Sequence, residues 1–151
     1  MSNRTFQSVN TNRPGLSAFD LSYTKTFTCD MGQLVPVMCD EMVPGDIFKV
    51  GNQAVLRMQP LLAPILHEIN VYTHYFFVPY RLLWDHWEDF ITGGVEGNLS
   101  YQLPIWHPGV YTQNSIWDYL GFPLLTGGLD TGAAPCDFPL RAYRLVWNFV
   151  L

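Results

Sequence analysis

The side chains that could do chemistry in this 151-residue sequence are few, and their spacing matches no familiar catalytic or metal site. Asp85 and Asp89 lie one helical turn apart and could share a metal ion or a proton, but like charges at this spacing more often form a solvated helix face. His86 and Glu88 do not fit the HExxH pattern, which places two histidines on one helix face to bind zinc. His74 lies in an alternating, strand-like stretch without two further ligands beside it. We therefore expect no metal ion.

Nucleophile and nucleotide chemistry have no better support. The sequence has no GxSxG elbow and no GxxxxGK[ST] phosphate loop, and its glycine-rich stretch 93–97 follows an expected helix rather than a strand. Cys29, Cys39 and Cys136 form no CxxC pair, metal knuckle or disulfide framework, so free buried thiols are expected. We expect no enzyme activity and no cofactor.

Composition restricts the partners. Charged residues make up 14% of the chain, where a soluble domain carries about 25%, while aromatic residues make up 15% and include five Trp. Such a surface is typical of a protein covered by protein partners. The net charge is −5 and Lys25 and Lys49 are the only lysines, so little direct nucleic-acid binding is expected. The N-terminus lacks the apolar core of a signal peptide, and no apolar run approaches a membrane span, so cytoplasmic synthesis is expected.

The elements that would position these residues are mostly strands. Residues 1–18 are rich in Ser, Asn, Thr and Arg, which predicts an extended N-terminal arm able to lie under a neighbouring subunit. From residue 19 to 27 apolar and polar residues alternate, as in a half-buried strand, and a second short strand is expected at 34–38. Val43, Pro44, Gly45 and Asp46 fit a type II turn.

Further strands are expected after this turn. Residues 47–50 and 54–58 form either one bulged strand or two strands joined by a tight turn, and the pattern leaves both open. The clearest strand is 69–78, which is apolar on both faces over its second half and ends at Pro79. The chain is therefore predicted to be mainly β.

Short helices and a long loop follow. A helix with one apolar stripe is expected after Pro79, ending at Thr92–Gly94. Residues 93–139 predict a long loop containing a short helix capped by Ser115. Residues 140–151 predict a helix without a stop signal. Because four or five strands are too few for a two-sheet sandwich, the chain is expected to be a fragment of a longer protein.

Two groups of side chains carry these expectations. The candidate core residues are Phe19, Leu21, Tyr23, Phe27, Val71, Tyr75, Phe77, Leu83, Trp87 and Phe90. The candidate subunit-interface residues are Arg4, Arg13, Tyr101, Trp106, Tyr111, Trp117 and Tyr119. Tyr and Trp dominate the energetics of protein interfaces, which favours this second assignment.

Several stretches resemble one protein family. The run 70–79 reads NVYTHYFFVP, and 81–94 reads RLLWDHWEDFITGG. Supporting stretches are Ser8–Asn10, Phe19–Ser22, Met31–Pro36, Pro44–Asp46, Asp118–Pro123 and Arg141–Asn148. Together they resemble the N-terminal part of the major capsid protein of gokushovirus-type phages (Microviridae).

The resemblance implies an antiparallel jelly-roll β-sandwich with short α-helices and long loops, of which residues 19–151 form the N-terminal portion. It implies self-assembly into a T=1 icosahedral shell, packaged single-stranded DNA neutralised by a separate small basic protein, and a virion assembled in the host bacterial cytoplasm. Receptor contact is not implied for this part of the protein.

Two other functions stay open on the sequence. A carbohydrate-binding β-sandwich could use the aromatic side chains between residues 98 and 117 to stack on sugar rings. A hydrolase could carry its catalytic residues beyond Leu151. The first alternative predicts a monomer whose Trp fluorescence responds to glycans, and the second predicts a pocket with perturbed titrating groups.

Overall fold

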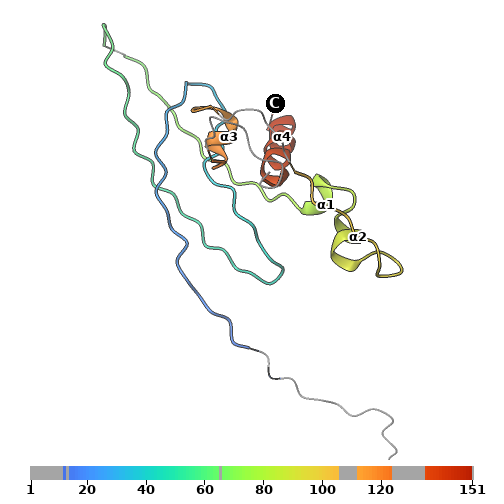
Figure 1. Cartoon of the computed structure of the whole chain (residues 1–151). Coiled ribbons are helices and arrows are strands. Elements are labelled where there is room, and N and C mark those ends of the chain that lie inside the picture. Colours follow the sequence, from blue (N-terminus) through green and yellow to red (C-terminus); the bar gives the residue numbers. More distant parts are fainter. Residues whose placement is uncertain (1–11, 13, 65, 106–111, 124–134, 151) are drawn as a thin grey trace, which may run out of the picture.

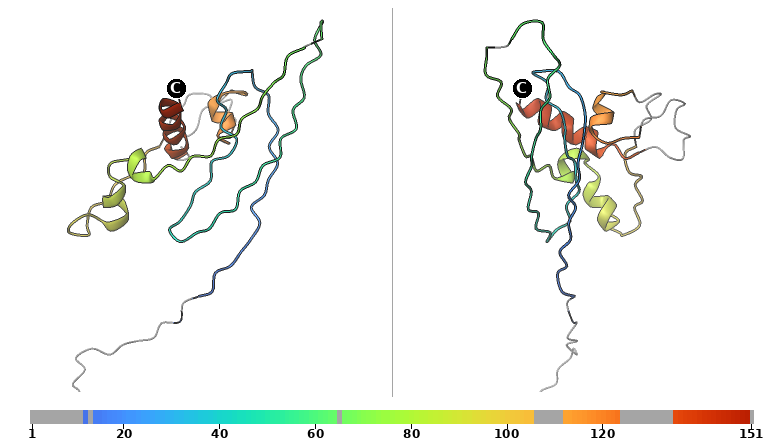
Figure 2. Two further views of the ribbon diagram at one scale, coloured as in Figure 1. Left: turned by 180° about the vertical axis from the view of Figure 1, so that it is seen from behind. Right: turned by 90° about the vertical axis from the view of Figure 1, so that its left-hand side faces the viewer.

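Four helices are formed by the part of the chain that the structure describes. The computed structural model describes residues 12, 14–64, 66–105, 112–123 and 135–150. The helices are α1 (Tyr80–Leu83), α2 (Trp87–Thr92), α3 (Ile116–Tyr119) and α4 (Phe138–Val150). Before α1, residues 14–64 and 66–79 form long extended segments that fold back on one another, and we call them the extended courses. The helices gather at one end of them (Figures 1 and 2). None of the helices formed by these residues is long and apolar enough to cross a membrane.

The expected strands at 19–27, 34–38, 47–58 and 69–78 are extended but do not form a sheet. No β-strand is present in the described ranges, and one isolated antiparallel bridge joins Ile105 to Cys136. The described part of this single chain therefore shows no sheet of the predicted β-sandwich. The physical reason is that a strand is stabilised by cross-strand hydrogen bonds and by burial of its side chains. Here these side chains face solvent, as Val55 does at 92% exposure.

The type II turn at Val43–Asp46 is confirmed. The Asp46 amide donates to the Val43 carbonyl at 3.1 Å, and Gly45 has φ 98°. The Asp46 carboxylate also accepts a hydrogen bond from the Val43 amide at 3.1 Å. This positive φ is what a type II turn demands at its third position, where Gly carries no Cβ penalty.

The helix predicted after Pro79 is present but divided. Pro79 precedes α1 with φ −72°, and Gly93 ends α2 with φ 79°, so both expected ends are confirmed. Between them Trp84 leaves the helix, with φ −156° and ψ 121°. The Trp84 ring lies 5.6 Å from Phe90 and 6.3 Å from Tyr101. We attribute the break to these tertiary contacts, which outweigh local helix propensity.

The last predicted helix is confirmed, two residues earlier than expected. α4 begins at Phe138, with Pro139 in its first turn, where a missing amide is tolerated. Its beginning is buried, since Phe138 is 6% and Leu140 2% exposed, whereas Phe149 near its end is 80% exposed. The helix is therefore anchored at its N-terminal half.

The core of the chain is small. Its buried hydrophobic side chains, among the described residues, are Leu83, Tyr119, Phe122, Phe138 and Leu140. The chain exposes 13884 Å², whereas surface scaling gives roughly 7,800 Å² for a compact protein of 17.3 kDa. Most of its hydrophobic side chains are thus open to solvent.

Most of the candidate core residues are exposed in the described chain, so their place in a core stays a prediction. Leu83 is 8% exposed and Trp87 is half-buried. The exposed ones are Phe19 (75%), Leu21 (60%), Tyr23 (55%), Phe27 (36%), Val71 (53%), Tyr75 (59%), Phe77 (76%) and Phe90 (36%). Seven of these eight lie on the extended courses, which have no opposing layer within the described chain. The cysteines are free, as expected, but Cys29 and Cys39 are exposed and Cys136 is half-buried, so the expected burial is wrong.

Candidate functional site

An aromatic cluster joins α1, α2 and the start of α4. Tyr80 stacks on Trp87 with ring centroids 4.4 Å apart and an interplanar angle of 23°. Phe138 lies 5.0 Å from the Tyr80 ring and 5.9 Å from the Trp87 ring, and Trp84 lies 6.2 Å from Phe138. Stacked and edge-on aromatic pairs add to the free energy of burial. These rings therefore join α1, α2 and α4 in one aromatic cluster.

An ion pair fixes α4 beside this cluster. Arg141 Nε lies 2.8 Å from Asp137 Oδ2, and Arg141 Nη1 donates to the Leu83 carbonyl at 3.1 Å. The Asp137 amide donates to the Pro104 carbonyl at 2.9 Å. The Leu83 carbonyl is at the end of α1, where helix carbonyls have no partner within the helix. Asp137 and Arg141 therefore connect α1, residue 104 and α4.

Asp137 is buried in an unusual way for a carboxylate. The residue is 5% exposed, and its Oδ1 has no hydrogen-bond partner among the described residues. Its other oxygen, Oδ2, accepts a hydrogen bond from Arg141 Nε, which is its charged partner. A buried carboxylate is costly without a partner, so Arg141 is the residue on which this arrangement depends.

Tyr80 connects the cluster to an extended course. Burial raises the pKa of the Tyr80 hydroxyl to about 12, and the negative charge of Glu41 and a hydrogen bond to it act in the same direction. The phenol is therefore neutral at physiological pH. Its neutral form is the one that can remain buried beside a carboxylate.

A second contact region attaches α3 to the first extended course. The Tyr119 hydroxyl donates to the Thr28 carbonyl at 2.7 Å, and its ring meets Phe27 edge-on at 5.8 Å. Lys25 Nζ donates to the Tyr119 carbonyl, and burial lowers the pKa of Lys25 while the Asp118 carboxylate opposes this. Tyr119 was expected at a subunit interface, but it is 8% exposed and buried within its own chain.

Side-chain hydrogen bonds also join the extended courses to one another and to α4. The Tyr143 hydroxyl of α4 donates to the Leu34 carbonyl at 2.9 Å. Asn52 Nδ2 lies 3.0 Å from Thr73 Oγ1, which places two courses side by side. These side-chain hydrogen bonds join the extended courses, which form no β-sheet hydrogen bonds with one another within the described residues.

The remaining interface candidates differ in where they lie. Tyr101 is half-buried and stacks on His86 at 4.5 Å with an interplanar angle of 10°. Trp117 is half-buried and meets Phe122 edge-on at 6.0 Å. Arg4, Arg13, Trp106 and Tyr111 lie outside the described residues. The Tyr101 and Trp117 rings therefore contact aromatic rings of their own chain.

Sequence reasoning missed Asp137 and Arg141. Their i, i+4 spacing in a chain with little charge was the available signal. It was not used because residue 137 was assigned to the loop.

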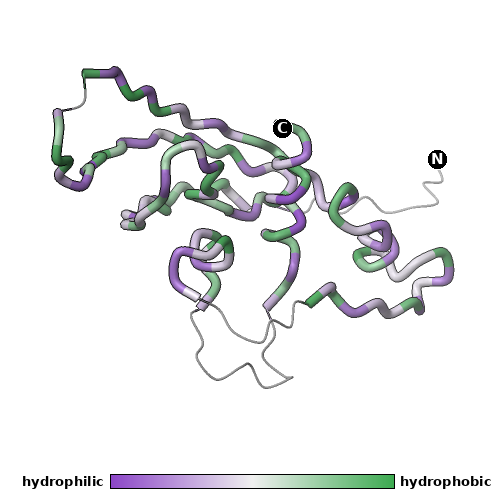
Figure 3. The backbone as a smooth tube through the Cα atoms, turned by 90° about the horizontal axis from the view of Figure 1, so that it is seen from above, coloured by the Kyte–Doolittle hydropathy of each residue, from purple (hydrophilic) through white to green (hydrophobic). Residues whose placement is uncertain are grey.

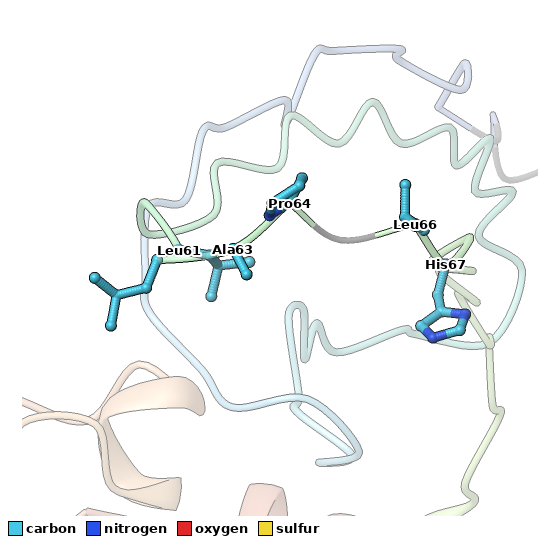
Figure 4. A pocket seen from close by; sticks show the side chains of 6 residues that line it. Leu61, Ala63, Pro64, Leu66 and His67 are labelled. Carbon is cyan, nitrogen blue, oxygen red and sulfur yellow. The ribbon is translucent and has the colours of Figure 1, made fainter.

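The exposed apolar surface lies mainly on the extended courses. Figure 3 shows hydrophobic and hydrophilic stretches alternating along them. At the far end of one excursion Leu61 is 57%, Leu62 111% and Leu66 92% exposed. We call these three residues the apolar tip. The tip and its neighbours Ala63, Pro64 and His67 line an open hollow of about 550 Å³ (Figure 4).

A groove of about 430 Å³ lies between α3 and α4. It is lined by Ile116 and Trp117 of α3 and by Leu140, Tyr143, Arg144 and Trp147 of α4. Leu140 is almost fully buried, whereas Trp147 is 40% exposed. We call it the α3–α4 groove. Its lining is mostly apolar and aromatic, which is the composition of surfaces that bind other proteins.

Within the described residues, no group of three or more His, Cys, Asp or Glu could hold a metal ion. His74 has a ring neighbour, Phe76, at 6.1 Å. The features that can act on another molecule are therefore the apolar tip, the α3–α4 groove and the exposed faces of the courses.

Comparisons with known proteins agree with one another. The family described as "Capsid protein (F protein)" matches residues 5–149. The chain is similar to "Capsid protein VP1" of Chlamydia phage 1, at 40% identity over 98% of this chain and 26% of the relative. It is similar to "Capsid protein VP1" of Bdellovibrio phage phiMH2K, at 33% identity over 93% of this chain and 26% of the relative. "Capsid protein VP1" of Spiroplasma virus 4 is 23% identical over 60% of this chain and 16% of that protein.

The chain thus spans about a quarter of the length of the first two relatives, 26% in each case. No solved structure matches it.

Proposed function

Because this chain belongs to the phage capsid F protein family, we propose that it is the part of a major capsid protein that helps build the closed shell of a small single-stranded DNA phage. The family is one of structural proteins rather than enzymes. In the shell, copies of the same polypeptide cover one another's apolar surfaces. We place the protein in the virion on the same ground.

The observation that carries the proposal is the exposed apolar surface. Side chains such as Val55, Phe77 and Leu62 are 92%, 76% and 111% exposed, so they need cover from the rest of the polypeptide or from neighbouring copies. Covering one such side chain contributes roughly 1.5–3 kcal/mol. Repeated over identical copies, one self-complementary contact closes a symmetric container.

We propose that the extended courses become the strands of an antiparallel jelly roll in the assembled protein. The alternation at 19–27, the turn at Val43–Asp46 and the apolar run at 69–78 support this, since they suit strands with one or two covered faces. In this proposal residues 19–151 are the N-terminal portion of the domain, residues 1–18 are an arm under a neighbouring subunit, and 93–139 is an elaborated connection. Residues Tyr101 and Trp117, and with them Arg4, Arg13, Trp106 and Tyr111, remain interface candidates.

We also propose that a separate small basic protein neutralises the packaged DNA. A net charge of −5 with two lysines gives this chain little attraction for phosphate. Other virion proteins would complete the particle.

The experiment is expression of the full-length gene product with its partner proteins, followed by sedimentation and electron microscopy. Closed particles of one size are the expected result. A full-length product that remains monomeric at high concentration, together with its partners, would overturn the proposal.

A further inference from the structure

Two of the extended courses run in opposite directions and touch through their side chains. Asn52 Nδ2 donates a hydrogen bond to Thr73 Oγ1 at 3.0 Å, and the chain turns back between them at the apolar tip (Figure 1). In an antiparallel pair of strands, side chains that are opposite each other on one face come this close. The contact therefore indicates a register in which residues 49–58 pair with residues 67–76 and Asn52 is opposite Thr73.

This register sorts the side chains onto two different faces. The face that carries Asn52 and Thr73 is otherwise mostly apolar, with Val50, Leu56, Met58, Ile69, Val71 and Tyr75 on it. The other face is mixed, and it carries all the Lys, Arg and Glu side chains of the two segments, which are Lys49, Arg57 and Glu68. A slip of one residue would join the apolar side of each segment to the mixed side of the other, so the pattern opposes such a slip.

The large ring at one end of the mixed face is already covered within the chain. Phe76 meets Phe149 of α4 edge-on, with ring centroids 6.5 Å apart. His74 lies 6.1 Å from Phe76, as expected for side chains two residues apart on one side of an extended segment. The alternation that the register requires is therefore present in the backbone at this end.

The same register puts Arg57 opposite Glu68. A shift of two residues in either direction, which keeps the faces, would instead put Arg57 opposite Leu66 or Asn70. Both charged side chains are exposed, so neither is held by a core. Opposite charges across a strand pair are stabilising and like charges are destabilising. Charge thus selects, among the registers with the same faces, the one that the Asn52–Thr73 contact indicates.

We propose that Arg57 and Glu68 form a cross-strand ion pair that fixes residues 49–58 against residues 67–76 in the assembled protein. The inference rests on the proposed conversion of the extended courses into strands, and it specifies how two of them pair. Arg57 and Glu68, both of which the structure describes, form no ion pair with each other in the single chain. The pair closes when the two segments form their backbone hydrogen bonds, and it lies at the end of the ribbon nearest the apolar tip.

The first test traps the register with a disulfide in the full-length protein. Val55→Cys with Asn70→Cys puts two thiols opposite each other, where a Cα separation of about 4.5–5.5 Å suits a disulfide. The controls combine Val55→Cys with Tyr72→Cys, which is shifted by two residues, or with Val71→Cys, which lies on the other face. After mild oxidation with diamide, peptide mass spectrometry should find the bond between positions 55 and 70 in most subunits. An equal yield in either control, or no bond in any variant, would overturn the register.

The second test is a charge exchange read as the yield of closed particles. Arg57→Glu and Glu68→Arg are each expected to lower the yield about twofold or more, because each puts like charges opposite each other. The double variant is expected to restore most of the yield. Lys49→Glu with Glu68→Arg is the matched control, since it has the same net charge but leaves Arg57 opposite an arginine. A double variant no better than this control would contradict the ion pair.

The two levels of proposal fail differently. If the native full-length protein forms no particles, the shell-building function fails, whereas the disulfide test can still be read on the unassembled subunit. If native particles form and the bond between positions 55 and 70 does not, shell building stands and only this register is wrong.

Discussion

Trp87 stacks on Tyr80 across the break between α2 and α1, with ring centroids 4.4 Å apart. The pair spans the residue, Trp84, at which the expected single helix is interrupted. Since Phe138 of α4 lies against both rings, α1, α2 and α4 depend on one another. None of α1, α2 or α3 is long enough to be stable as an isolated helix. The aromatic cluster is therefore the unit on which the helical part of this chain is built.

Trp87→Ala is expected to lower the free energy of unfolding by about 3 kcal/mol, at the low end for a Trp truncation because the side chain is half-buried. It should also abolish assembly, since α2 loses its ring contacts with Tyr80 of α1 and Phe138 of α4. Chemical denaturation of the unassembled full-length subunit measures this. Glu96→Ala, at an exposed position on the loop after α2, is the control and should change the free energy by less than about 0.5 kcal/mol. Equal effects of the two variants would contradict the role of the cluster.

Arg141→Leu is expected to destabilise the subunit by about 3 to 5 kcal/mol, because it leaves the buried Asp137 carboxylate without its cationic partner. Thermal or chemical unfolding gives the value. The double variant Asp137→Asn with Arg141→Leu should recover part of the loss, since no unpaired charge remains. A double variant less stable than Arg141→Leu would show that the carboxylate is stabilised by something other than Arg141.

Stability should fall in the alkaline range through Tyr80. Its pKa is raised to about 12 in the folded chain from an ordinary value of 10.0, so the unfolded chain releases this proton first as the pH rises. The contribution is therefore complete below about pH 10 and is lost between about pH 10 and 12. Unfolding measured from pH 8 to 12 should decline less steeply in Tyr80→Phe than in the native protein. Parallel curves would contradict this assignment.

Gly45→Ala is expected to cost about 1 kcal/mol or more, because φ 98° is strained for any residue with a Cβ. Gly51→Ala is the matched control, since Gly51 lies on an extended course without a positive φ and has open space around it. Denaturation midpoints of the two variants give the comparison. A larger loss in Gly51→Ala would place the critical turn at residues 51–53 instead.

Features that depend on neighbouring residues could be predicted from the amino-acid sequence. The Val43–Asp46 turn and the ends of the first helical region at Pro79 and Gly93 were predictable, because Pro and Gly act through local φ preferences. α3 begins after Ser115 as predicted, but the predicted side-chain cap is wrong, because the Ser115 hydroxyl donates to the Thr112 carbonyl at 2.6 Å instead. The family was also readable from contiguous runs such as 70–79. The extended courses were predictable from alternation, but whether they pair could not be, because pairing depends on strands distant in the chain.

Which side chains meet could not be predicted in this way, because it depends on contacts between distant segments. The break at Trp84, the burial of Tyr119 against Thr28 and the Asp137–Arg141 connection to Leu83 each involve segments that are far apart in sequence. Alternation likewise predicted Phe19 and Phe77 as core, yet they are exposed because burial needs an opposing layer, which is a property of the packed whole rather than of the pattern. Local sequence sets backbone conformation, and long-range contacts set burial.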